Sequence, residues 1–119
     1  MHELGIAQNI LQIVQQSVPA AQAANVRTIR LRIGKLSGVV AESLDFCFNV
    51  MLGETEMKRA GLEIEHIPIS ALCKDCGNRF NIDELDFTCG ACKSTHLEML
   101  SGKELEIVDI ELEDETESL

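Results

Sequence analysis

Two kinds of hydrophobic spacing alternate along the first part of the chain. From Leu4 to Val18, apolar residues recur three or four positions apart, which predicts an amphipathic helix that ends at Pro19. The AAQAAN segment that follows permits further helical turns. The next segment, VRTIRLRIG at residues 26–34, alternates apolar and polar residues instead, so it predicts a strand with one buried face.

The same order of helix and strand recurs further on. The segment ESLDFCFNVMLGET returns to helical spacing, and GLEIEHIPI alternates again as a second strand. His66 falls on the inward phase of that strand and is predicted to be packed or hydrogen-bonded. The last strand is predicted in KELEIVDIELE, where the apolar phase switches between Ile107 and Val108. This switch predicts a bulge or a change of buried face.

Residues 73–96, CKDCGNRFNIDELDFTCGACKSTH, differ in composition from the rest, with two cysteine pairs and little aliphatic content. Cys73 and Cys76 form one C-x2-C pair, and Cys89 and Cys92 form another. Two such pairs supply the four thiolates of a tetrahedral Zn²⁺ site, although iron is left open by the spacing alone. Because four protein ligands close the site, its first role is expected to be structural.

These patterns together predict an α+β fold in two domains. A small mixed sheet of about three strands packs with two helices in the body, residues 1–70 and 100–119. A tetrathiolate zinc-ribbon domain, residues 71–99, is inserted before the last strand. The fifth cysteine, Cys47, lies on the apolar stripe of the second helix and is predicted to be a reduced core residue.

Composition narrows the classes of function. The chain has 20 acidic against 10 basic residues and a net charge of −10, which disfavours binding to nucleic acid or to an anionic membrane surface. No apolar run approaches the length of a membrane span, and the start lacks the basic stretch of a signal peptide. Five cysteines without an export signal favour metal binding over disulfides, so a cytoplasmic setting is expected.

The first three residues, MHE, form a candidate chelate. The α-amine of Met1, which bulky His2 is expected to protect from removal, can bind one ion together with the amide and imidazole nitrogens of His2. Planar nitrogen ligation favours Ni²⁺ or Cu²⁺ over Zn²⁺. Glu3 offers a carboxylate or a backbone nitrogen as a further ligand. The residues alone leave open a plainer interpretation, in which Glu3 only complements the dipole of the helix.

Several segments in order give a family resemblance. MHELGIAQNI, RLRIGKLSGVVAESLDFCF, the two C-x2-C pairs and SGKELEIVDIE together resemble the HypA/HybF family of hydrogenase nickel-incorporation proteins. The resemblance implies a nickel metallochaperone, not an enzyme, with nickel at His2 and Glu3 and zinc at the four paired cysteines. It also implies a nickel-handling GTPase as partner and the [NiFe]-hydrogenase large subunit precursor as acceptor. Some members serve urease as well, and the sequence leaves monomer and homodimer both open.

The sequence departs from the family pattern in one place and offers two further candidate ligands. The second cysteine pair, CGACK, lacks the Pro and the following Gly of many relatives, which predicts a looser turn with unchanged ligands. Some relatives contribute to nickel binding an acidic residue after the first strand or a histidine of the zinc module. Here these positions suggest Glu42 and His96. The residues themselves favour Glu42 as a first-turn helix carboxylate, and they leave His96 open between a loop residue and an auxiliary ligand.

A rival class is a zinc-ribbon regulatory or adaptor module without nickel chemistry. A zinc hydrolase or deaminase is disfavoured, because the sequence has no His-Glu-x-x-His helix and its zinc ligands leave no open position. Nickel binding that depends on His2 separates the carrier from the adaptor.

Overall fold

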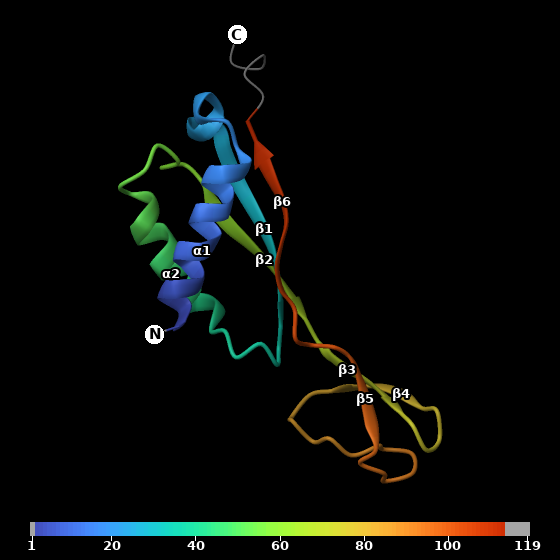
Figure 1. Cartoon of the computed structure of the whole chain (residues 1–119). Helices are drawn as coiled ribbons and strands as arrows, with labels where there is room; N and C mark the ends of the chain where they lie inside the picture. Colours follow the sequence, from blue (N-terminus) through green and yellow to red (C-terminus); the bar gives the residue numbers. More distant parts are fainter. Residues whose placement is uncertain (1, 114–119) are drawn as a thin grey trace.

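The computed structural model describes residues 2–113, and its two three-stranded sheets lie end to end (Figure 1). The elements in chain order are α1 (His2–Ser17), the 3₁₀ helix η1 (Ala20–Asn25), β1 (Val26–Gly34), α2 (Ala41–Leu52), β2 (Gly61–Ile67), β3 (Ile69–Cys73), β4 (Arg79–Ile82), β5 (Leu97–Ser101) and β6 (Leu105–Leu112). The predicted α+β class is confirmed. Within the described range, no helix has the length and apolar character needed to cross a bilayer.

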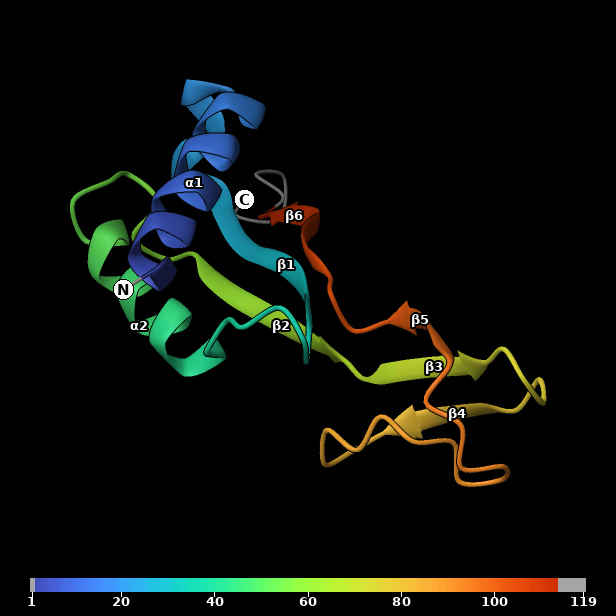
Figure 2. The same ribbon diagram turned by 60° about the horizontal axis from the view of Figure 1, so that its bottom comes forward.

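The first sheet has the order β2-β1-β6, with β1 parallel to β2 and antiparallel to β6. It is therefore the mixed three-stranded sheet that the sequence predicts. Helices α1 and α2 lie side by side over one face of this sheet (Figures 1 and 2). The alternating apolar residues of β1 point into the resulting core, and its charged residues lie on the open face. The buried core residues are Ala7, Ile10, Val14, Val18, Val26, Ile29, Leu31, Ile33, Leu44, Phe48, Leu52 and Met57.

The structure confirms two local predictions in this body. The AAQAAN segment forms η1, so the chain continues in helical turns after Pro19. In β6, Asp109 pairs with Arg30 and Ile107 pairs with Leu31, which leaves Val108 without a β1 partner. This extra residue is the predicted bulge, and it accounts for the switch of apolar phase in the sequence.

The expectation for His66 is wrong, because its side chain is exposed. His66 pairs in register with Ile33 of β1. Because β2 is an edge strand, it has a neighbouring strand on one side only, and residues on its inward face are less covered than those of β1. Cys47 follows its prediction. Its free thiol is half-buried and packs against the core.

The second sheet, order β4-β3-β5, was not predicted as strands. The segment read as one strand, residues 61–69, is in fact two strands that Pro68 separates, since proline has no N–H to donate to a ladder. The buried apolar core of this second sheet consists of Ile69, Ala71 and Ile82, with partly buried side chains packed against it from Leu36, Phe80, Leu97 and Met99. The expected domain boundaries, after residues 70 and 99, fall within β3 and β5.

A glycine contact joins the two sheets. Strand β1 ends at Gly34. Beyond this point β3 follows β2, β5 leads into β6, and β3 and β5 pair with each other (Figure 2). The Gly34 N–H donates to the Glu104 carbonyl at 2.8 Å, and the Leu36 N–H donates to the Gly102 carbonyl at 2.6 Å. Gly102 has a φ of 122°, a conformation that favours glycine.

Candidate metal centres

The predicted nickel site lies at the exposed start of α1. Helix α1 begins at His2, whose side chain is 58% exposed, and its Nε2 lies 3.2 Å from Glu3 Oε2. The first N–H groups of a helix have no intrahelical partner, so the helix does not require the His2 amide hydrogen. The Met1 α-amine, the other predicted nitrogen ligand, lies outside the described residues.

Glu3 has a structural role that the sequence did not reveal. Glu3 is only 7% exposed. Its carboxylate accepts a hydrogen bond at 3.2 Å from the backbone N–H of Val40, the N-cap residue of α2. This bond ties the start of α2 to the start of α1. It is also the main reason why the pKa of Glu3 lies below its ordinary value of 4.5.

This lowered pKa predicts a pH-dependent contribution to stability. A carboxylate whose pKa is lower in the folded than in the unfolded protein stabilises the fold at pH values above its ordinary pKa. This contribution is lost as the pH falls through the folded-state pKa. Glu3→Gln is therefore expected to lower the melting temperature at pH 7, and the difference from the unmodified protein should shrink below about pH 4.5. Thermal melts across this pH range measure the effect. Glu84→Gln, at an exposed position, should show no such convergence. A constant difference at every pH would contradict the role of the charge.

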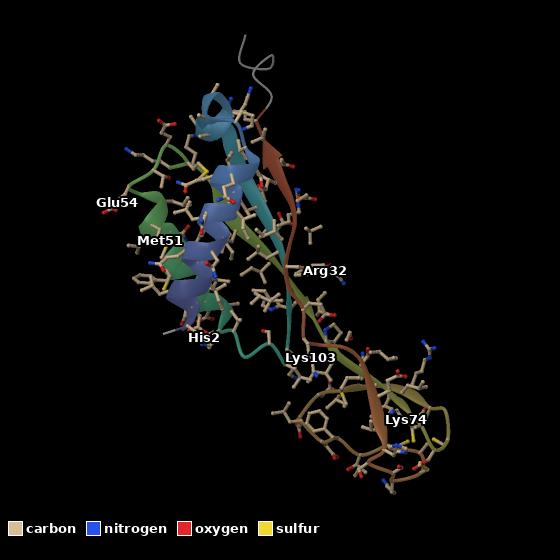
Figure 3. All side chains as sticks on the ribbon, in the orientation of Figure 1. His2, Arg32, Met51, Glu54, Lys74 and Lys103 are labelled. Carbon is tan, nitrogen blue, oxygen red and sulfur yellow. The ribbon has the colours of Figure 1, made fainter. Side chains whose placement is uncertain are left out.

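Glu42 lies close to this terminus, in the first turn of α2. Its residue is exposed and lines, with Glu3 and Cys47, a hollow of about 470 Å³ between the two helices. The structure thus brings both predicted carboxylates to the same hollow. His96 lies elsewhere, in the cysteine module, where its carbonyl accepts from the N–H of Lys74. Figure 3 shows Lys74 and His2 at well-separated parts of the molecule.

The four paired cysteines come together in one cluster. The Sγ atoms of Cys73 and Cys92 lie 3.5 Å apart, those of Cys76 and Cys89 lie 3.6 Å apart, and all four fall within 4.8 Å of one another. A tetrahedral zinc with Zn–S bonds of about 2.3 Å places its sulfurs about 3.8 Å apart, so the cluster fits this ion. Cys73 and Cys89 are buried, whereas the second cysteine of each pair is exposed. Such a cluster is typical of a zinc-binding module.

Both cysteine turns close in the same way. The Gly77 N–H donates to the Cys73 carbonyl and the Lys93 N–H donates to the Cys89 carbonyl, each at 2.8 Å. The expected loosening of the second turn is therefore not seen. Instead Lys93 takes a φ of 65°, close to the 78° of Gly77. A left-handed conformation costs a non-glycine residue about 1–2 kcal/mol, and the turn absorbs that cost at Lys93.

Backbone hydrogen bonds prepare two of the thiols to bind a cation. The N–H of Cys76 holds the pKa of the Cys73 thiol below its ordinary value of 9.0, and the N–H of Cys92 lowers the pKa of Cys89 to about 6. The N–H of Ser94 lowers the pKa of Cys92, but contacts with neighbouring thiols and burial raise it overall to about 12. The four thiols therefore do not ionise together on their own, and a bound cation removes this conflict.

His96 joins the two cysteine turns through hydrogen bonds. Its Nδ1 lies 3.4 Å from Asp75 Oδ1, and its N–H donates at 3.0 Å to the Ser94 hydroxyl, which itself donates to Asp75. The bond from Ser94, followed by the contact with His96, lowers the pKa of Asp75. These contacts give His96 a supporting position in the module. Its role as an auxiliary nickel ligand stays a prediction.

Comparisons with known proteins agree on one family. A family model described as hydrogenase/urease nickel incorporation metallochaperone, HypA, matches residues 1–112. The hydrogenase maturation factor HypA of Desulfatibacillum aliphaticivorans is 42% identical over 118 residues, which cover 98% of this chain and 91% of that protein. That of Desulfosudis oleivorans is also 42% identical, over 96% of this chain and 100% of its own length.

The fold agrees as well. The solution structure of the nickel metallochaperone HypA from Helicobacter pylori superposes with a TM-score of 0.61, at 22% identity, over 95% of this chain and 98% of that one. The match spans both sheets and extends from the N-terminal helix to the last strand. The chain therefore belongs to the HypA family of hydrogenase/urease nickel-incorporation metallochaperones, whose members carry metal and are not enzymes.

Proposed function

We propose that this protein binds Ni(II) at its N-terminus and, with a nickel-handling GTPase, delivers it to the large subunit precursor of [NiFe]-hydrogenase. The observation that carries the proposal is the position of His2, at the exposed first turn of α1 beside Glu3 and the hollow lined by Glu42. The nitrogen ligands are the α-amine of Met1 and the amide and imidazole of His2, a set suited to Ni²⁺.

Glu3 contributes to this site in a specific way. Its carboxylate already accepts the Val40 N–H, and taking that carboxylate as a metal ligand would leave the N–H without this acceptor. The bond therefore favours the backbone nitrogen of Glu3 as the ligand and leaves its side chain to hold the terminus against α2. Glu42, exposed across the same hollow, is the nearby carboxylate that can approach the metal without breaking this contact.

The four-cysteine cluster has a separate role in the proposal. Cys73, Cys76, Cys89 and Cys92 hold Zn(II) as a structural ion, because four thiolates close the coordination shell. The bound ion stabilises the second sheet. The two proposed metal sites lie in separate parts of the molecule, since Figure 3 shows His2 on the helical layer and Lys74 in the cysteine module.

Nickel titration by calorimetry tests the terminal site. The protein with its native terminus is expected to bind one Ni(II). Loss of a ligand weakens a metal site by at least about tenfold, so His2→Ala and a version with a short N-terminal extension should both bind nickel much more weakly. His66→Ala is the matched control, because His66 is an exposed histidine on β2. Equal binding by all four proteins would contradict the terminal site and favour an adaptor without nickel chemistry.

Delivery requires its own measurement. Nickel-loaded protein is mixed with the purified hydrogenase large subunit precursor, with and without the GTPase and GTP, and nickel in the precursor is measured. Transfer that the GTPase accelerates supports the proposal. Transfer to apo-urease in place of the hydrogenase precursor would make urease the acceptor, and no transfer to either would contradict the delivery step.

A further inference from the structure

We infer that the outer edge of β6 docks an extended segment of a partner protein in which apolar residues alternate with basic residues. The inference is independent of the nickel site. Strand β6 stands at the end of the first sheet and pairs with β1 on one side; no other strand of residues 2–113 pairs with it (Figure 1). The N–H and C=O groups on the outer side of an edge strand can pair with an added strand.

An apolar groove runs beside this edge. It has a volume of about 450 Å³ between α1 and β6. Ile13 and Leu105 are 48% and 44% exposed at the groove, although both are large aliphatic residues. An added strand next to β6 would place every second side chain over the groove, because side chains alternate between the faces of a sheet. The apolar lining residues are Ile6, Ile10, Ile13, Leu31, Leu105 and Ile107.

The face of β6 that points away from the helices carries carboxylates, which favour basic side chains in a bound partner segment. On the open face of the sheet, Arg30 and Arg32 are shared among carboxylates of both neighbouring strands; the closest pair, Arg30 Nη1 and Asp109 Oδ1, is 2.8 Å apart. Five carboxylates against two guanidinium groups leave a surplus of three negative charges. The carboxylates belong to Glu63, Glu65, Glu106, Asp109 and Glu111. Glu106 would lie beside a strand added at Leu105–Val108, and Asp109 and Glu111 would lie beside its continuation past the bulge, so lysine or arginine at alternate positions of the added strand is favoured.

The same charges argue against a second copy of this chain as the occupant. Pairing two β6 strands would bring Glu106, Asp109 and Glu111 of both copies together, and like charges on adjacent strands are destabilising. The bulge at Val108, a residue 52% exposed, interrupts the regular edge. The pairing segment is therefore Leu105–Val108, directly beside the groove.

Peptide binding to the full chain tests this inference. The probe is a short fluorescent peptide that alternates valine with lysine, and its comparator carries glutamate in place of lysine; anisotropy measures the affinity. The lysine peptide is expected to bind and the glutamate peptide is not. Ile13→Glu should weaken binding about tenfold, as loss of an apolar anchor does. The matched control is Val50→Glu, at an exposed aliphatic position of α2 outside the groove, which should leave the affinity unchanged.

Hydrogen exchange locates the bound peptide. Slower exchange of backbone amides in Leu105–Val108 on peptide binding supports strand addition. Equal affinity for the two peptides, or no effect of Ile13→Glu, would overturn the inference. Sedimentation of the protein alone decides on a second copy: a dimer that Ile13→Glu dissociates would place another copy of the chain on this edge and also overturn it.

Discussion

Removing the metal from the four-cysteine site is expected to unfold residues 69–101 while the helices and the first sheet remain folded. The second sheet fully buries three apolar side chains, those of Ile69, Ala71 and Ile82, and partly buries four more against them, those of Leu36, Phe80, Leu97 and Met99. Each such side chain contributes at most about 1.5–3 kcal/mol, whereas each ordered backbone residue costs about 1–2 kcal/mol. Zinc in small structural sites supplies about 10–16 kcal/mol, which is the contribution that this module lacks without its ion.

Hydrogen exchange measured by mass spectrometry checks this expectation. After chelation, or in Cys89→Ser, amides of β3 and β5 should lose protection while those of α1 keep it. Cys47→Ser provides the matched control, since this free cysteine packs against the first core and is not part of the cluster. Full protection of β3 after the metal is removed would show that the module folds through its side chains alone.

The second large effect is expected from Gly34→Ala, which should destabilise the protein by about 3 kcal/mol or more. A β-carbon on Gly34 would lie 2.1 Å from the Gly102 carbonyl oxygen and 2.2 Å from its carbon. Both are backbone atoms, and the Leu36 N–H fixes that carbonyl by a hydrogen bond. Gly102 has little room to retreat, because Ile69 lies 3.1 Å from the position of its own missing β-carbon.

Urea unfolding measures this change in the free energy of unfolding. Gly61→Ala is the matched control, because Gly61 is also in a strand of the first sheet but has open space where a β-carbon would project. Its effect should stay within about 0.5 kcal/mol. Similar losses in the two variants would mean that general strand effects of glycine, and not the contact with Gly102, set the cost.

Periodicity predicted the first sheet and its helices because these elements are long and have one buried side. The alternation in β1 gave Ile29, Leu31 and Ile33 as inward residues, and all three are buried. The phase switch in β6 gave the bulge, since a one-residue insertion exchanges the two faces of a strand. Cysteine spacing was equally informative. Four sulfurs on two tight turns have few ways to meet other than around one ion.

Other features depend on contacts that local patterns do not record. The hydrogen bond between Glu3 and Val40 joins residues far apart in sequence. From the sequence, the predicted partner of the Glu3 carboxylate was therefore the helix dipole or a metal ion. Strands β3, β4 and β5 have only four or five residues each, and apolar alternation over such short lengths does not by itself identify a strand. Lys93 adopts the conformation of a glycine because the cysteine turn requires it there.

The cysteine module is joined to the rest of the chain at two adjacent positions. Its two ends leave the first sheet side by side: the hydroxyls of Ser70 and Ser101 lie 2.6 Å apart, and β3 and β5 pair from that point onward. A replacement segment must match these two adjoining strands and the loop after β1, where Lys35 donates to the Asp83 carbonyl and Leu36 packs against the core of the second sheet. A module with different loops that keeps these contacts is therefore expected to fold when it is joined at Ser70 and Ser101.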